Sequence, residues 1–200
     1  MTLTPPSSSS SSSSSTRDKK DKSTANRYPK AVVFDLDYTL WPCWCDTHIQ
    51  TPLKSVSKTE IVDNYGTYLS LYPHVESIVQ ELAANNVRIV GASRTATPQV
   101  AKKLLTMLHI GNKPAISYFD SLQWGQGSKT KHIKLAANQL GMANDLQSGE
   151  FILFDDETRN RDVNKVNCHF VHVPDESKGL TREIFEKGLK QWASATPSTL

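Results

Sequence analysis

The sequence predicts an α/β fold in which a mostly parallel β-sheet is covered by helices on both faces. Short apolar runs, typical of buried strands, alternate along the chain with segments whose apolar residues recur at helical spacing. This alternation favours parallel strands, because each helix carries the chain back across the sheet. Several of the apolar runs also end on polar side chains, as is typical of a parallel sheet that presents a ligand site at the carboxyl ends of its strands.

The composition indicates one ordinary globular domain. The chain has 200 residues, of which 38% are hydrophobic and 22% are charged, close to the average of globular proteins. Its net charge of +3 is too small, and its lysines are too scattered, to indicate nucleic-acid binding. No apolar run is long enough to span a membrane, and the N-terminus lacks the apolar segment of a signal peptide. We therefore expect no nucleic-acid or membrane partner.

The three cysteines indicate a reducing compartment. Cys43, Cys45 and Cys168 are an odd number, which argues against a disulfide framework. We expect a cytoplasmic protein, with the nucleus as a second candidate compartment. The short basic cluster of Lys19, Lys20 and Lys22 fits a solvated charged linker better than a nuclear address. We also expect a monomer or a weak dimer.

Residues 1–27 are expected to form a disordered tail. An unbroken serine run from Ser7 to Ser15 precedes a charged stretch, and neither has the apolar surface that would offset the entropy of ordering. We assign residues 28–194 to the folded domain and residues 195–200 to a flexible C-terminus.

The domain begins with a buried strand at residues 31–34, whose apolar side chains lead directly into Asp35. The polar stretch 42–72 is expected to be a long loop above the end of this strand rather than another buried element.

Two helices on either side of a second strand come next. Pro73 suits the first turn of a helix, residues 87–92 read as a buried strand, and Thr97 and Pro98 begin a helix that Gly111 ends. The expected inward faces are Val75, Ile78, Val79 and Leu82 for the first helix and Val100, Leu104, Leu105 and Leu108 for the second.

The remaining elements continue the alternation. They are a short strand at 115–119, a helix at 129–140 ended by Gly141, a strand at 151–154, a helix around Val163 and Val166, a strand at 168–173 and a helix at 181–192.

Paired carboxylates follow two of these strands. Asp35 and Asp37 come after the first strand, and Asp155 and Asp156 come after the strand at 151–154. Carboxylates from two strand ends form a hard oxygen site suited to Mg²⁺. The hydroxyl of Ser93 after the second strand, together with the ammonium of Lys129, would complete a pocket for an anion.

Hydrolysis of a phosphate monoester fits these residue types. It needs charge neutralisation, an in-line nucleophile and a proton for the leaving oxygen. Asp35 can be a nucleophile that forms an aspartyl-phosphate. Asp37 would serve as general acid and then as general base, which requires a raised pKa. Mg²⁺ and Lys129 would keep Asp35 ionised.

The blocks that carry these residues resemble the haloacid dehalogenase superfamily of phosphohydrolases, and more closely its eukaryotic magnesium-dependent phosphatase family, the acid-phosphatase branch. The similar blocks are the segments 34–42, 92–95, 127–129 and 153–160. The resemblance implies a Rossmann-like three-layer sandwich with only a minimal cap, because 42–72 is too short for the large cap of many relatives.

The resemblance also implies a Mg²⁺-dependent phosphatase that acts on phosphotyrosine proteins or on sugar or fructosamine phosphates. It implies that Asp35, the main-chain carbonyl of Asp37 and Asp155 hold the metal, with Asp156 close by. Arg94, directly after Ser93, looks like a second phosphate contact.

Other interpretations of the same residues remain open. Trp41 and Trp44 are as well explained by anchoring their loop as by forming an aromatic rim against the substrate. The segment containing Cys43, Cys45 and His48 has no companion ligands at zinc-site spacing.

A phosphomutase or phosphotransferase remains an alternative, since an aspartyl-phosphate can be passed to a sugar hydroxyl instead of water, but the short cap argues against it. The sequence also bears on two alternatives with a different mechanism. No cysteine is followed six residues later by an arginine, which excludes a cysteine-based tyrosine phosphatase as far as local sequence allows. The second alternative is a non-catalytic module that binds Mg²⁺ or phosphate.

Overall fold

The computed structural model describes residues 1–2 and 27–195. The predicted disordered tail, apart from its ends, and the C-terminal residues 196–200 lie outside the described residues. Within the described part, no helix is long and apolar enough to cross a membrane.

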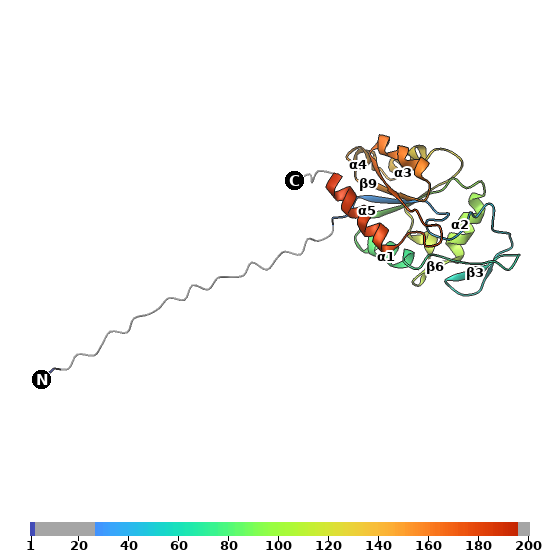
Figure 1. Cartoon of the computed structure of the whole chain (residues 1–200), viewed down its shortest axis with the longest axis horizontal. Helices are drawn as coiled ribbons and strands as arrows, with labels where there is room; N and C mark the ends of the chain where they lie inside the picture. Colours follow the sequence, from blue (N-terminus) through green and yellow to red (C-terminus); the bar gives the residue numbers. More distant parts are fainter. Residues whose placement is uncertain (3–26, 196–200) are drawn as a thin grey trace.

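A five-stranded parallel sheet forms the centre of the fold, in the order β10-β9-β1-β5-β8 (Figure 1). Its strands are β1 (Ala31–Phe34), β5 (Arg88–Ala92), β8 (Ser121–Gln123), β9 (Phe151–Asp155) and β10 (Cys168–His172). The predicted parallel α/β architecture is therefore confirmed.

Helices cover both faces of this sheet. They are α1 (Val75–Ala84), α2 (Pro98–Met107), α3 (Lys129–Gln139), α4 (Ala143–Gln147) and α5 (Arg182–Ala195). The alternation of side chains along β1 shows how the faces are divided. Val32 and Phe34 pack in a core cluster with α1, α2 and α5, whereas Ala31 and Val33 pack in a second cluster with α3 and α4. The result is a three-layer sandwich.

The register of β1 brings the ends of three strands level with one another. Phe34 is paired with Phe154 on one side and with Gly91 on the other. The backbone N–H of Asp35 donates to the carbonyl of Phe154 at 2.9 Å. The residues that follow β1, β5 and β9 therefore share one edge of the sheet.

The prediction of a loop without buried structure between residues 42 and 72 is wrong. This segment contains a small antiparallel sheet of β2 (Lys54–Ser55), β3 (Glu60–Val62) and β4 (Tyr68–Ser70). Ile61 and Leu69 from this sheet are buried in the main core. We call the segment 42–72 the cap, and it is as small as the resemblance implies.

Three further elements differ from prediction. Helix α2 ends at Met107, and Gly111 instead lies in the turn between β6 (His109–Ile110) and β7 (Lys113–Pro114), where its φ of +58° suits glycine. The predicted strand at 115–119 is a 3₁₀ helix, η1 (Ala115–Tyr118), and strand β8 follows it. The predicted helix around Val163 is also a 3₁₀ helix, η2 (Thr158–Val166).

Candidate active site

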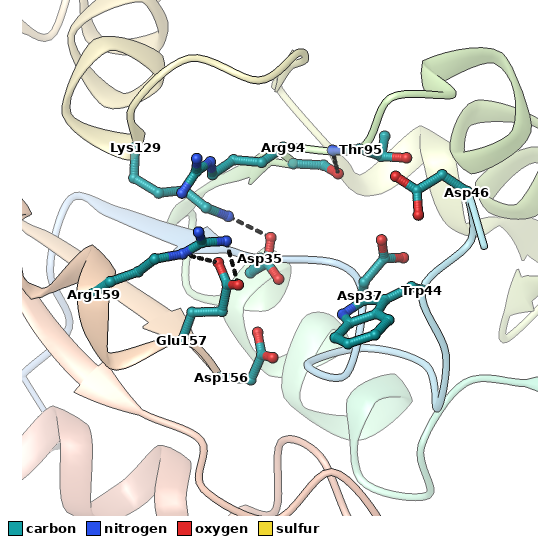
Figure 2. A pocket seen from close by; sticks show the side chains of 11 residues that line it. Asp35, Asp37, Trp44, Asp46, Arg94, Thr95, Lys129, Asp156, Glu157 and Arg159 are labelled. Carbon is teal, nitrogen blue, oxygen red and sulfur yellow. Dashed lines mark hydrogen bonds and ion pairs between the residues drawn. The ribbon is translucent and has the colours of Figure 1, made fainter. Parts of the chain in front are cut away.

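A cavity of about 240 Å³ lies at the carboxyl edge of the sheet (Figure 2). It is lined by Asp35, Asp37, Trp44, Asp46, Ser93, Arg94, Thr95, Lys129, Asp156, Glu157 and Arg159. The lining comes from the segments after β1, β5 and β9, from the cap and from the first residue of α3. The structure thus brings together six of the predicted site residues in one cavity, and a seventh, Asp155, has a carboxylate oxygen within 4.8 Å of those of Asp35 and Asp156.

Lys129 is the centre of the charge network at the floor of this cavity. Its ammonium donates to Asp35 Oδ1 and to the carbonyl of Ala92, and it lies 3.1 Å from Asp155 Oδ2. Its side chain is 1% exposed. Ser128 caps the N-terminus of α3 by accepting from the backbone N–H of Lys131 at 3.2 Å. This cap fixes the first turn of the helix and so aims Lys129 at the strand ends.

Burial and charge act in opposite directions on these groups. Burial raises the pKa of Asp35 well above its usual value, and the Lys129 charge offsets only part of that effect. Burial lowers the pKa of Lys129, but the charges of Asp35 and Asp155 outweigh it and raise that pKa above its usual value. The lysine therefore stays cationic, while the carboxylates around it lack enough positive charge.

Asp35, Asp155 and Asp156 could hold a metal ion. Each offers a carboxylate oxygen, and the three oxygens lie within 4.8 Å of one another. Burial, followed by the charge of Asp155, raises the pKa of Asp156 to about 6. Crowded carboxylate oxygens match the donor type that Mg²⁺ prefers, and the raised pKa values of Asp35 and Asp156 reflect the lack of a counter-charge there.

Asn160 supports this carboxylate cluster, whereas the sequence left it open between ordering its loop and contacting the substrate. Its amide donates to both oxygens of Asp155, at 2.9 and 3.0 Å, and its side chain is buried in η2. The backbone N–H of Glu157 also donates to Asp155, at 2.9 Å. Asp155 is therefore the completely buried, firmly held member of the acid pair, and Asp156 is the one that lines the cavity.

Asp37 is positioned by a turn that follows β1. Tyr38 adopts a φ of +53°, and its backbone N–H donates to the carbonyl of Trp41 at 2.8 Å. The turn brings the indole N–H of Trp41 to Asp37 Oδ1 at 2.7 Å, and the backbone N–H of Cys45 donates to the same oxygen at 3.2 Å. Burial raises the pKa of Asp37, and these hydrogen bonds offset the effect only in part. A raised pKa is what a general acid needs near neutral pH.

Trp41 does not line the cavity, which corrects its assignment as a substrate contact. Its side chain is completely buried, so no substrate can stack on it. Its role in the structure is to hold Asp37. Trp44, three residues later, is 46% exposed and does line the cavity.

Ser93 and Arg94 occupy the opposite wall. The Ser93 hydroxyl accepts from the backbone N–H of Thr95 at 3.2 Å, which leaves its proton available to a ligand oxygen. Within the described residues, the buried Nε of Arg94 has no hydrogen-bond partner. Both observations are what a phosphate contact would need, and the contact itself stays a prediction.

Two charged residues of the lining, Asp46 and Glu157, were not predicted to be site residues, and the sequence left Arg159 open between contacting the substrate and ordering its loop. Asp46 Oδ2 accepts from the backbone N–H of Ala96 at 3.0 Å, which ties the cap to the loop after β5. Glu157 accepts from Arg159 Nε at 2.9 Å. The sequence offered a signal only for the second pair, which directly follows the Asp155-Asp156 block.

The charge balance of the lining is negative. Asp35, Asp37, Asp46, Asp156 and Glu157 contribute five carboxylates, whereas Arg94, Lys129 and Arg159 contribute three cations. A phosphate ester adds negative charge of its own, so a divalent cation at the carboxylate cluster would be needed to bring the two together.

Comparison with known proteins identifies the family. The family model described as acid phosphatase matches residues 27–195. A HAD-like hydrolase superfamily protein of Schizosaccharomyces pombe is 40% identical over 151 residues, which cover 72% of this chain and 85% of the relative. Magnesium-dependent phosphatase 1 of Homo sapiens is 33% identical over 175 residues, which cover 87% of this chain and 93% of the relative.

A solved structure agrees with this assignment at the level of the fold. A HAD-superfamily hydrolase from Ehrlichia chaffeensis superposes with a TM-score of 0.54 at 13% identity, covering 83% of this chain and 98% of that chain. The family match covers residues 27–195, which include every residue that lines the cavity. The chain belongs to the acid phosphatase family of the haloacid dehalogenase-like hydrolases.

Proposed function

We propose that the protein is a Mg²⁺-dependent phosphatase that hydrolyses phosphate monoesters through an aspartyl-phosphate on Asp35. The observation that carries this proposal is the placement of Asp35 at the floor of the cavity. Its carboxylate accepts a hydrogen bond from the buried Lys129 and lies beside the carboxylates of Asp155 and Asp156. A nucleophilic carboxylate, a fixed cation and a set of metal ligands are thereby within reach of one phosphate group.

The residues present fit Mg²⁺. Asp35, Asp155 and Asp156 would hold it, together with the Asp37 main-chain carbonyl that the family resemblance adds. When bound, Mg²⁺ supplies positive charge that offsets the repulsion between the carboxylates and the phosphate. The name of the human relative agrees with a magnesium requirement, since it is called a magnesium-dependent phosphatase.

The side chains of this chain then divide the reaction between them. Ser93 and Arg94 bind and orient the phosphate oxygens, and Lys129 keeps Asp35 ionised. Asp35 attacks phosphorus, the bond to the ester oxygen breaks, and Asp37 gives its proton to that leaving oxygen. In the second half, Asp37 takes a proton from water, whose oxygen attacks phosphorus and releases Asp35 and inorganic phosphate.

Phosphotyrosine proteins are the substrates we propose first, with sugar or fructosamine phosphates as the alternative. The cap is too small to enclose a substrate as a separate domain would, and this supports access by a phosphorylated protein side chain. We further propose a cytoplasmic location, since the chain carries three free, buried cysteines.

The test is a panel of phosphate esters assayed with Mg²⁺ and with chelator. Wild type should release phosphate only with Mg²⁺, and Asp35→Asn and Asp37→Asn should lose at least about a hundredfold in kcat. Asp162→Asn is the matched control, because Asp162 is exposed on η2 outside the cavity. Turnover that survives chelation or Asp35→Asn would refute the mechanism. A wild type that binds Mg²⁺ but turns over none of the esters would favour the binding module.

A further inference from the structure

Trp44 is an aromatic side chain that the mechanism leaves without a role. It lines the cavity, and 46% of the residue is exposed, which is high because tryptophan is mostly buried on average. Its indole is nevertheless fixed. The ring stacks on the His48 ring, with centroids 5.7 Å apart and planes at 15°. It also makes a T-shaped contact with the Tyr38 ring, with centroids 5.4 Å apart and planes at 85°. The backbone N–H of Trp44 also donates to His48 Nδ1 at 3.2 Å.

The position of this ring relative to the reacting groups suggests what it contacts. Figure 2 shows the charged ends of Lys129, Arg94 and Arg159 on one side of Asp35, and Trp44 with Asp37 on the other. A phosphate group is drawn to the cationic side. The leaving oxygen must face its proton donor, so the rest of the ester extends past Asp37 toward Trp44.

We propose that Trp44 is a specificity-determining residue, whose indole is a pre-formed platform for a flat, aromatic leaving group. This inference rests on the proposed function, and it adds the part of the substrate that the platform selects. A planar ring that extends from the phosphate can lie against the indole, and stacked or edge-on aromatic pairs are favourable beyond the area they bury. Because His48 and Tyr38 already hold the indole, little side-chain entropy is lost on binding.

The charges around the platform point in the same direction. Asp46 and Trp44 both line the cavity, on the same side as Asp37. Glu157 already forms an ion pair with Arg159. A leaving group with a carboxylate or a second phosphate would meet the negative charge of Asp46, whose hydrogen bonds come from the neutral backbone N–H of Ala96 and the Thr47 hydroxyl. A neutral aromatic ring avoids that repulsion. The site should therefore favour aryl phosphates over acyclic or anionic esters.

The experiment measures binding, so that it does not depend on turnover. Phenylphosphonate and methylphosphonate, which are not hydrolysed as esters, are titrated into Mg²⁺-loaded protein by calorimetry. Wild type should bind phenylphosphonate about five- to tenfold more tightly than methylphosphonate. Trp44→Ala should lose this preference with methylphosphonate binding unchanged, and Trp44→Phe should keep most of it. Tyr65→Ala is the matched control, because Tyr65 is a more exposed cap aromatic outside the cavity.

Kinetics then separates this proposal from the proposed function. With phenyl phosphate, Trp44→Ala should raise KM about five- to tenfold and leave kcat within about twofold, and with glycerol phosphate it should change neither. Equal preference for the two phosphonates in wild type, or a preference that survives in Trp44→Ala, would overturn the platform. A protein that shows the binding preference but hydrolyses no ester would keep the platform and refute the phosphatase.

Discussion

Lys129→Met should destabilise the metal-free protein strongly. The substitution replaces an ammonium that is 1% exposed and contacts Asp35, Asp155 and the carbonyl of Ala92. Methionine fills a similar volume but leaves two buried carboxylates without their cation, beside a third on Asp156. Removing one partner of a buried ion pair costs about 3–5 kcal/mol. With a urea m-value of about 2 kcal/mol/M, the unfolding midpoint should fall by about 2 M.

The loss should depend on pH and on Mg²⁺. Burial raises the pKa of Asp35 in the folded protein, and the Lys129 charge is what partly offsets it. A carboxylate whose folded pKa is raised destabilises the fold while it is ionised, and the penalty disappears as pH falls through the folded pKa. The gap between wild type and Lys129→Met should therefore be largest near neutral pH and shrink as pH falls toward the unfolded carboxyl pKa of about 4. Mg²⁺ binds only the folded site, and it should narrow the gap because the variant, which lacks the Lys129 charge, gains more from the added cation.

Lys134→Met is the control, because Lys134 is exposed on the same helix. It should change the free energy of unfolding by less than about 0.5 kcal/mol. The reasoning fails if Lys129→Met unfolds at the same urea concentration as this control. It also fails if the gap is the same with and without Mg²⁺ at every pH.

Three more outcomes are expected. Asn160→Ala should raise the Mg²⁺ concentration for half-maximal activity about 10- to 100-fold in a metal titration, since Asp155 loses its amide support, and a rise under twofold would argue against that role. Alkylation by iodoacetamide near neutral pH should leave activity intact, because all three cysteines are buried and burial raises the pKa of Cys43 to about 12; rapid inactivation would contradict this. Gly188→Ala should lower stability by about 1–3 kcal/mol in urea, because the new Cβ would lie 2.8 Å from a ring carbon of Phe154, and a more stable variant would mean that α5 can shift.

The central strands could be predicted because their signal is local. In β1, β5 and β9 nearly every side chain is buried, since helices cover both faces of the sheet. Such strands appear in the sequence as continuous apolar runs. The polar residues that end them then share one edge by topology alone, which is why most of the site could be predicted.

The cap could not be predicted, because its signal is too short. Each of its strands has two or three residues. Strand β3 buries only Ile61, and strand β4 buries only Leu69. One buried residue in a strand establishes no periodicity. The structure of the cap depends on contacts with the main core, which are not visible in the local sequence.

The different roles of the two tryptophans could not be predicted for a similar reason. Both follow the same strand, and composition cannot tell which one faces the solvent. The turn at Tyr38 decides it, because a positive φ there folds the chain back until the Trp41 indole reaches Asp37. Trp44 is carried beyond that turn into the cavity.

The charge balance of the site is a tertiary property, and it links stability to the proposed chemistry. Asp35 follows β1, whereas its cation Lys129 begins a helix 94 residues later and the neighbouring acids follow β9. Only the folded chain brings them together, so no local pattern reveals that Asp35 and Asp155 share one buried lysine beside a third carboxylate on Asp156. That shortage of positive charge disfavours the metal-free fold and favours cation binding. The excess of negative charge that destabilises the metal-free fold therefore also favours Mg²⁺ binding at this site.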